Sequence, residues 1–221
     1  MEHPFITYEP LSFSTDESLI RSKEFYLLMN KRRSVRFFSD KDVPEEIIRH
    51  IINTAGTAPS GAHKQPWVFC VIRNKDLKHQ IRVLAEEEEK ENYESRMSER
   101  WLNDLAPLGT NDVKEFIDIA PWIIVVMKKS YDFDETGTKT NNYYVSESVG
   151  IACGFLIAAI HQAGLVTLTH TPSPMNFLAK ALERPENEKP FLLLPVGYPA
   201  NQCKVPDLKR KTHDEIAIYF R

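Results

Sequence analysis

Three arginines surround a serine in the segment Arg-Arg-Ser-Val-Arg at residues 32–36. If this segment is extended, alternate side chains share a face, so Arg32, Ser34 and Arg36 point one way and Arg33 points the other. Guanidinium groups bind phosphate and other planar anions through paired hydrogen bonds. The chain has no Walker or Rossmann glycine pattern, so an anion here would be bound in another way. The alternative is a solvent-exposed basic patch, since surface arginines are common.

A second candidate is the turn at residues 59–62, which reads Pro-Ser-Gly-Ala. Ser60 offers a hydroxyl, and a tight bend exposes backbone N–H groups to a ligand. Gly61 lacks a side chain and would let a ligand approach the backbone closely. The alternative is an ordinary turn between two elements, for which this composition is also typical.

The third candidate is the acidic run at residues 86–89, which is followed by Tyr93. Glu89 and Tyr93 are four residues apart, so they are neighbours on one face of a helix. This carboxylate and phenol could hold an ammonium group, and Lys114 downstream could hold a carboxylate. The alternative is a solvated acidic face whose charges repel one another. Because such a helix is weakly ordered without a counter-ion, we predict a ligand-ordered lid over residues 86–110.

The remaining residue types supply no reaction chemistry of their own. The seven histidines and three cysteines show no metal-ligand spacing, so no metal site is expected, and there is no Gly-x-Ser-x-Gly nucleophile motif. Cys70, Cys153 and Cys203 are odd in number and far apart, which favours reduced thiols. An enzymatic reading therefore requires a cofactor, and the arginine segment is where an anionic one would bind.

Composition limits the class of protein and its compartment. A net charge of −3 and the lack of any RNA- or DNA-binding motif argue against nucleic acid as a partner. The N-terminal residues lack the basic and apolar regions of a signal peptide. The longest apolar run, residues 151–160, is too short to span a bilayer. We therefore expect a soluble cytoplasmic protein that does not contact a membrane.

Periodicity and turn residues predict the elements that position these candidates. Residues 32–38 are expected to be extended, residues 132–140 to form a loop, and residues 16–31 to form an amphipathic helix with its apolar stripe at Leu19, Ile20, Phe25, Leu27 and Leu28. Further helices are expected at 44–56, 75–84, 142–162 and 175–182, and strands at 67–72, 122–127, 165–169 and 191–196.

This mixture of elements favours an α+β or α/β fold in a single domain over residues 1–221. From Val149 onward the helix at 142–162 is apolar on every side, which is typical of a core or of an obligate interface. The tail at residues 200–221 has no core pattern of its own, so it is either mobile or held by a partner subunit.

Beyond these features, the chain resembles the iodotyrosine deiodinases, a family of flavin-dependent proteins with the nitroreductase fold. The matching stretches are RRSVRFFS at 32–39, TAPSGAHKQPW at 57–67, EEEEKENY at 86–93, SVGIACG at 148–154, LVTLTHTP at 165–172, and LLPVGYP through VPDLKRK at 193–211. The resemblance implies an α+β fold, with a central, mostly antiparallel sheet surrounded by helices. It also implies an intertwined homodimer in which residues 200–221 extend onto the partner. The membrane anchor of vertebrate members is absent, which supports a soluble form.

The resemblance implies FMN as the cofactor. Arg36 would reach the N1/O2 edge of the flavin, where a cation stabilises the anionic reduced form. Arg32 and Ser34 would lie nearer the phosphate, with Arg210 as a further phosphate contact. The full set of implied FMN-binding residues is Arg32, Arg33, Ser34, Arg36, Pro59, Ser60, Gly61, Thr169, His170, Thr171 and Arg210, with Pro59, Ser60 and Gly61 coming from the other subunit. The Thr171 hydroxyl would lie near the flavin N5. His170 departs from the family, which usually has consecutive threonines here.

The resemblance also implies the reaction, which is removal of halogen from mono- and diiodotyrosine to give tyrosine and halide. Glu89, Tyr93 and Lys114 would clamp the amino acid, and the backbone N–H of Ala62 would stabilise the phenolate. Thr171 and Ala62 would thus be the catalytic residues. Electrons would come from NAD(P)H, directly or through a reductase. The alternatives are a general FMN-dependent nitro-, quinone- or enone reductase, and a flavin-binding protein without turnover.

Overall fold

The computed structural model describes residues 3–221 and divides the chain into two units, residues 1–32 and residues 33–221. The first unit contains α1 (Thr15–Asn30), which begins where the Ser14 hydroxyl accepts a hydrogen bond from the backbone N–H of Glu17 at 3.2 Å. This confirms the first predicted helix. The predicted apolar stripe is wrong, because the five consecutive apolar residues 25–29 encircle the helix and no residue of α1 is buried.

The second unit is built on a four-stranded antiparallel sheet with the strand order β1-β2-β6-β5. The strands are β1 (Trp67–Ile72), β2 (Trp122–Lys129), β6 (Glu188–Gly197) and the short β5 (Val166–Thr167). All four predicted strands are present, although β2 and β6 are longer than predicted and β5 is shorter. The predicted α+β class with a mostly antiparallel central sheet is confirmed.

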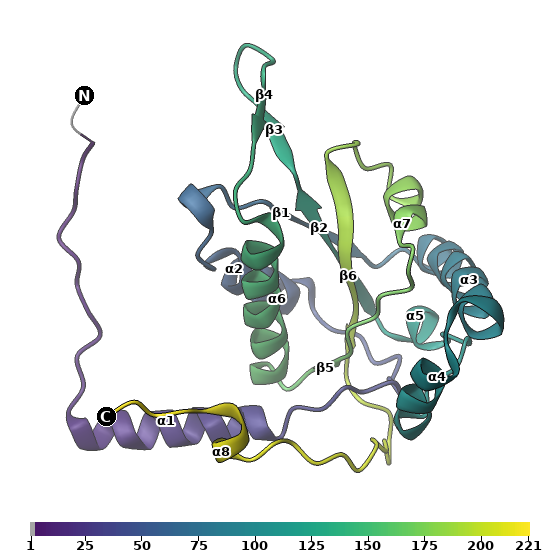
Figure 1. Ribbon diagram of the computed structural model, residues 1–221, viewed down its shortest axis with the longest axis horizontal. Helices are drawn as coiled ribbons and strands as arrows, with labels where there is room; N and C mark the ends of the chain where they lie inside the picture. The colour runs from purple at the N-terminus through teal and green to yellow at the C-terminus, as the bar shows by residue number, and fades with distance from the viewer. Residues whose placement is uncertain (1–2) are drawn as a thin grey trace. The chain divides into compact units, whose positions relative to one another are not determined.

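Helices cover both faces of this sheet (Figure 1). On one face lie α2 (Glu45–Gly56) and α6 (Val145–Gln162). On the other face lie α3 (Lys75–Glu91), the short α5 (Phe116–Ile119) and α7 (Asn176–Ala181). The helices predicted around residues 44–56, 142–162 and 175–182 are therefore confirmed, while α5 was not predicted.

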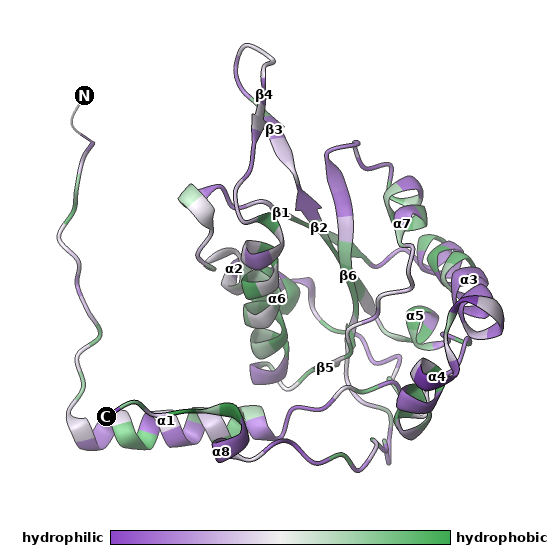
Figure 2. Ribbon diagram, in the orientation of Figure 1, coloured by the Kyte–Doolittle hydropathy of each residue, from purple (hydrophilic) through white to green (hydrophobic). Residues whose placement is uncertain are grey.

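Strand β2 contributes side chains to the core on both faces of the sheet. Its alternate residues enter different core clusters: Trp122, Ile124 and Val126 pack with α2 and α6, whereas Ile123, Val125 and Met127 pack with α3, α5 and α7. A strand buried on both faces reads as a continuous apolar run rather than an alternating one. Figure 2 shows this apolar centre. The indole N–H of Trp122, which is 4% exposed, donates to the Val43 carbonyl at 2.8 Å.

Helix α6 is the one helix among residues 3–221 that is long and apolar enough to cross a membrane by length and composition. One side of it, including Val149, Cys153 and Leu156, is buried against α2 and the sheet. Ile151 and Phe155 on other sides are exposed. These contacts place one side of α6 in the core of the second unit and leave an apolar surface outside that core.

Helix α3 extends to Glu91, beyond the predicted end at residue 84. The prediction failed because the acidic residues do not form one repelling face. Three of the four glutamates of the run have a cationic partner in space: Arg82 for Glu86, Arg96 for Glu88 and Lys114 for Glu89. A π-helical turn, labelled η2 (Asn92–Arg96), then leads into α4 (Glu99–Leu105) and a 3₁₀ turn, η3 (Ala106–Leu108). Residues 86–110 are thus largely helical.

The segment predicted as a loop at 132–140 is mostly a β-hairpin formed by β3 (Tyr131–Phe133) and β4 (Lys139–Asn141). The Asp134 carboxylate closes its turn by accepting hydrogen bonds from the backbone N–H groups of Thr136 and Thr138, both at 2.9 Å. In the tail, α8 (His213–Ile216) is the only helix or strand after residue 200. Ile218 and Phe220 at its end are exposed.

Candidate functional site

Glu89 and Lys114 form a buried ion pair. Glu89 lies on α3, and Lys114 lies two residues before α5. The Lys114 Nζ is 3.2 Å from Glu89 Oε2, and the side chains are 3% and 10% exposed. The same ammonium donates to the Asn111 carbonyl. Burial lowers the pKa of Lys114, and the Glu89 carboxylate opposes that shift.

Tyr93 lies beside this pair, in the π-helical turn that follows α3. Its ring centroid is 5.8 Å from the Lys114 Nζ. Burial raises the pKa of the Tyr93 phenol, the nearby Glu89 carboxylate raises it further, and a hydrogen bond with the Thr110 side chain lowers it. The structure therefore brings together the three side chains predicted from the acidic segment.

Arg36 and His170 lie near the same charges. Burial, the larger effect, lowers the pKa of Arg36, whereas the nearby Tyr93 raises it. Burial and then the positive charges of Lys114 and Arg36 lower the pKa of His170 to about 3, so its ring is neutral. Within residues 3–221, neither Arg36 Nε nor His170 Nε2 has a hydrogen-bond partner, although both atoms are buried. Two buried polar atoms without partners indicate a place for a ligand.

The backbone around His170 sets the direction of its neighbours. Its N–H and carbonyl pair with Leu193 of β6, at 2.9 and 3.0 Å, and its ring packs edge-on against Phe116 at 5.6 Å between centroids. His170 is 7% exposed, whereas Thr169 and Thr171 on either side are exposed. Alternation along an extended segment thus separates the two threonine side chains from the histidine.

The arginine segment is attached to the same edge of the sheet. Residues 33–38 are extended, as predicted, with Ser34 paired to Thr167 as a parallel bridge and the Val35 N–H donating to the Thr167 carbonyl at 3.1 Å. Arg33 donates to the Pro206 carbonyl, which attaches the tail to this segment. Arg210 is exposed, and Arg32 is the last residue of the first unit.

The turn at residues 59–62 lies beside α6, on the other face of the sheet from α3 and α5 (Figure 1). The Gly61 N–H donates to the Ser148 Oγ at 3.2 Å, and a Cβ at Gly61 would lie 2.9 Å from the Tyr143 carbonyl oxygen, so glycine is required there. The Ser60 Oγ accepts from the Gln65 N–H at 2.9 Å. Ala62 is exposed and has a φ of 48°, a conformation that non-glycine residues seldom adopt. Within one chain, this turn and the Glu89–Lys114 pair are on opposite faces.

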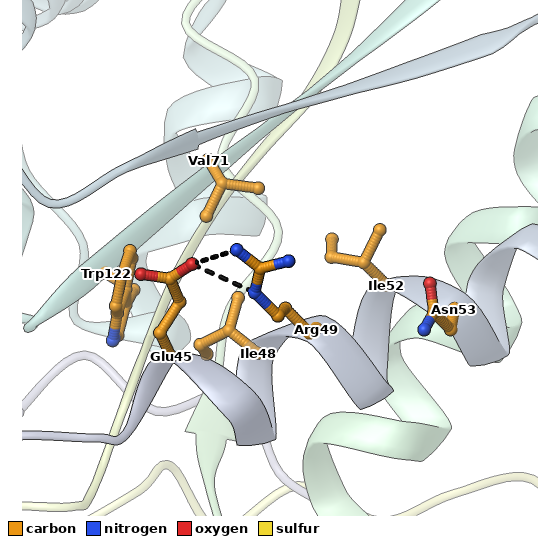
Figure 3. Close-up of a pocket in the computed structure, with 7 residues that line it drawn as sticks. All are labelled: Glu45, Ile48, Arg49, Ile52, Asn53, Val71 and Trp122. Carbon is orange, nitrogen blue, oxygen red and sulfur yellow. Dashed lines mark hydrogen bonds and ion pairs between the residues drawn. The ribbon is translucent and has the colours of Figure 1, made fainter.

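A separate groove of about 410 Å³ lies between α2 and β1. Figure 3 shows the Arg49 guanidinium bonded to the Glu45 carboxylate of the same helix, between Trp122 and Ile52. None of the predicted cofactor or substrate residues lines this groove. No group of three or more metal-ligating side chains occurs in the described part of the chain.

A family model described as the nitroreductase family matches residues 29–198, which are most of the chain. The chain belongs to the nitroreductase family. Its relatives include the iodotyrosine deiodinase of Haliscomenobacter hydrossis, 57% identical over 98% of this chain and 97% of the relative. The protein of the same name from Hydra vulgaris is 53% identical over 98% of this chain and 80% of its own length. The human iodotyrosine deiodinase 1 is 50% identical over 99% of this chain and 75% of its own length.

A crystal structure of oxidized iodotyrosine deiodinase bound to FMN and 3-iodo-L-tyrosine is similar to this nitroreductase-family chain, with a TM-score of 0.75 and 29% identity over 89% of this chain and 99% of that chain. A nitroreductase-like protein from Streptococcus mutans has a TM-score of 0.67 at 18% identity, over 91% of this chain and all of that chain. The first match and the relatives confirm the resemblance inferred from the sequence motifs, and the second supports the fold alone.

Sequence reasoning missed Arg82 and Asp118 beside the site of this nitroreductase-family chain, and it assigned Glu86 no contact beyond its place in the acidic run at residues 86–89. Arg82, Glu86 and Asp118 form a network beside the Glu89–Lys114 pair. The Asn111 carbonyl also accepts from Lys114, but a backbone carbonyl leaves no signal in a sequence because every residue has one. Arg82 and Glu86 are four residues apart, and this spacing was the one feature of the sequence that could have predicted a contact in the network.

Proposed function

We propose that this protein removes halogen reductively from halotyrosines in an FMN-dependent reaction, converting mono- and diiodotyrosine to tyrosine and halide. The observation that carries the proposal is the buried Glu89–Lys114 pair beside Tyr93, 3.2 Å between charged atoms. A site that already holds two opposite charges out of water is suited to a ligand with two opposite charges. A free amino acid is such a ligand.

The residues present fit FMN. Arg36 carries a buried Nε without a partner among the described residues, and an anionic ring edge would supply one. We assign FMN binding to Arg32, Arg33, Ser34, Arg36, Thr169, His170, Thr171 and Arg210, together with Pro59, Ser60 and Gly61 of a second copy. When bound in its reduced form, FMN supplies the electrons for the reaction.

Substrate binding would exchange one ion pair for two. In the substrate-free structure, Glu89 and Lys114 neutralise each other. The ammonium of the amino acid would pair with Glu89 and its carboxylate with Lys114, with Tyr93 beside them. No buried charge is then left alone, whereas a ligand with only one of the two charges would leave one uncompensated. This exchange favours a zwitterionic substrate over a neutral nitroarene, quinone or enone.

The reaction replaces the carbon–halogen bond with a carbon–hydrogen bond, takes up two electrons and one proton, and releases halide. We assign stabilisation of the phenolate to the backbone N–H of Ala62, whose strained φ of 48° turns the backbone of an exposed loop. We assign a hydrogen bond toward the flavin N5 to the exposed Thr171 hydroxyl. Closing residues 86–110 over the ligand would exclude water.

We propose that the protein acts as an intertwined homodimer. The turn at residues 59–62 and the Glu89–Lys114 pair lie on opposite faces of one chain, so a site that uses both needs two copies. The exposed apolar residues of α6 and of the tail are suited to contact a second copy. We place the protein in the cytoplasm, where its three free thiols stay reduced, with NAD(P)H as the source of electrons.

The experiment uses the purified protein with its flavin. Its absorbance should be that of a bound flavin, and after reduction it should form tyrosine and iodide from mono- and diiodotyrosine. A colourless protein that takes up no FMN, or a reduced holoprotein that releases no iodide, would contradict the proposal. The second candidate is a general nitro-, quinone- or enone reductase of the same fold. It is favoured if nitroarenes are reduced efficiently while halotyrosines neither bind nor react.

A further inference from the structure

Glu86 is bonded to the backbone of the residue that carries the buried ammonium. Its Oε1 accepts the backbone N–H of Lys114 at 2.6 Å. Glu86 lies on α3, three residues before Glu89, so both carboxylates project from the same side of one helix. Helix α3 therefore contacts Lys114 twice: Glu86 bonds its backbone, and Glu89 pairs with its Nζ at 3.2 Å.

Glu86 is itself held in place. The Arg82 guanidinium donates from Nε to Glu86 Oε1 at 2.8 Å and from Nη1 to Asp118 Oδ2 on α5 at 2.9 Å. Asp118 also contacts His79 Nδ1, at 3.1 Å. The side chains of Arg82, Glu86 and Asp118 are all partly buried. Charge-assisted bonds of this kind are stronger than neutral ones, so the Glu86 carboxylate has a defined position.

The far end of α5 has its own attachment. The ammonium of Lys78, a buried residue, donates to the Asp118 carbonyl at 2.9 Å and to the Ala120 carbonyl at 2.6 Å. Phe116 and Ile117 are buried in the core next to α3. Removing the Glu86 carboxylate therefore leaves α5 docked and frees mainly the segment that holds Lys114.

We infer that Glu86 is a positioning residue for the reaction: by holding the Lys114 backbone against α3, it places the Lys114 ammonium where the carboxylate of the amino acid binds. This inference rests on the proposed function. Glu86 does not touch substrate or flavin. Its loss raises the KM for halotyrosine and leaves FMN binding unchanged, since Arg36 and the flavin-binding segments are not attached to it.

The test compares four variants of the holoprotein. Glu86→Ala removes the acceptor, and Glu86→Asp withdraws it by one methylene. Glu86→Gln keeps an oxygen that can accept the Lys114 N–H. Glu87→Ala is the control, because Glu87 is exposed on the same helix. For each variant we measure the KM and kcat for monoiodotyrosine, the Kd for FMN, and the reduction rate of a nitroarene, which has no amino acid group.

The expected result is a KM raised about tenfold or more in Glu86→Ala and Glu86→Asp, as for loss of a charged hydrogen bond. Glu86→Gln should recover most of the affinity, and Glu87→Ala should match the parent. FMN binding and nitroarene reduction should not change in any variant. If Glu86→Ala does not fold, the Asp and Gln variants decide, since only the Asp variant should lose affinity.

An unchanged KM in Glu86→Asp, or equal losses in the Asp and Gln variants, would overturn the inference. A general loss of FMN and of nitroarene reduction would also overturn it, because it would show a merely structural role. These outcomes differ from failure of the proposed function, in which the parent protein itself releases no iodide from monoiodotyrosine.

Discussion

At the scale of single residues, we propose that the Glu89–Lys114 pair selects what the site binds. Both charges are buried, and each is the main compensation for the other. A buried ion pair adds little net stability, but removing one partner is costly because the remaining charge is left alone. The pair therefore serves ligand selection better than it serves the fold.

A double-mutant cycle tests this pair. Glu89→Gln and Lys114→Gln should each weaken halotyrosine binding by about 2–5 kcal/mol, because each leaves a buried charge without its partner. The double variant should lose less stability than the sum of the single variants, since no lone charge remains. Flavin fluorescence quenching gives the affinity, and urea unfolding gives the stability. Fully additive losses of stability would mean that the two charges do not interact.

His170 predicts a dependence of stability on pH. Its pKa in the folded protein is about 3, lowered by burial and by the cations Lys114 and Arg36, and this lies below the value of about 6.5 in an unfolded chain. Between these values only the unfolded state binds the proton. The stability from neutral His170 is therefore complete above about pH 6.5 and decreases as the pH falls.

The comparison with His170→Gln isolates this effect, because glutamine does not titrate and the carboxylates of the two proteins are the same. Between pH 6 and pH 4, the parent should lose about 1.4 kcal/mol per pH unit more than the variant in the free energy of unfolding. Denaturant unfolding at several pH values measures the difference. Parallel curves for the two proteins would show that His170 is not buried in its neutral form.

How far the sequence predicts the site depends on the distance between partners along the chain. Glu89 and Tyr93 are four residues apart, so helical geometry alone puts them together. The spacing to Arg82 marks Glu86 locally, but it does not predict that Glu86 is bonded to Lys114 while Glu87 is exposed. That difference comes from the packing of α5, which was not predicted because it is only four residues long. Lys114 was named as a possible carboxylate-binding residue, but its pairing with Glu89, 25 residues away along the chain, follows from the fold.

At the scale of elements, long elements with a clear apolar pattern were predicted, whereas short or polar ones such as α5 and the β3–β4 hairpin were not. Strand β2 was found because its residues are buried on both faces. The β3–β4 hairpin was missed because its short strands are polar and are held by their own pairing and the Asp134 turn. The end of α3 was placed too early because two of its glutamates pair with cations that follow the helix in the sequence. These pairs are Glu88 with Arg96 and Glu89 with Lys114.

The segment at residues 86–110 should open more readily than the rest of α3 when no ligand is bound. Ile81 and Ala85 in the earlier part of α3 are fully buried, whereas α4 has no buried residue. Few buried contacts give a low free energy of local opening. In hydrogen exchange, residues 92–110 should exchange faster than residues 75–85, and monoiodotyrosine should slow them. Strand β2 is the control, and slow exchange of 92–110 without ligand would contradict a lid.

At the scale of the whole molecule, the proposed flavin site uses the 59–62 turn of a second copy, so we expect flavin binding to depend on association. The turn lies on the α6 face, and the residues near Arg36 lie toward α3 and α5. Dilution to monomers should therefore release FMN, which is detected as a rise in free flavin fluorescence. Gel filtration at the same concentrations gives the oligomeric state. A monomer that keeps its FMN would contradict a site shared between two copies.

Of the three tryptophans, Trp101 and Trp122 would serve as optical reporters in a Trp67→Phe variant, because Trp67 in β1 is half-buried and would contribute to both signals. Trp101 on α4 is 52% exposed, whereas Trp122 is buried with its indole N–H bonded to Val43. Acrylamide should thus quench the emission of Trp101 and leave that of Trp122 nearly intact. In the flavin-free protein, the fraction of the emission that acrylamide quenches reports the state of α4. A red shift of the emission that is not quenched reports unfolding of the core.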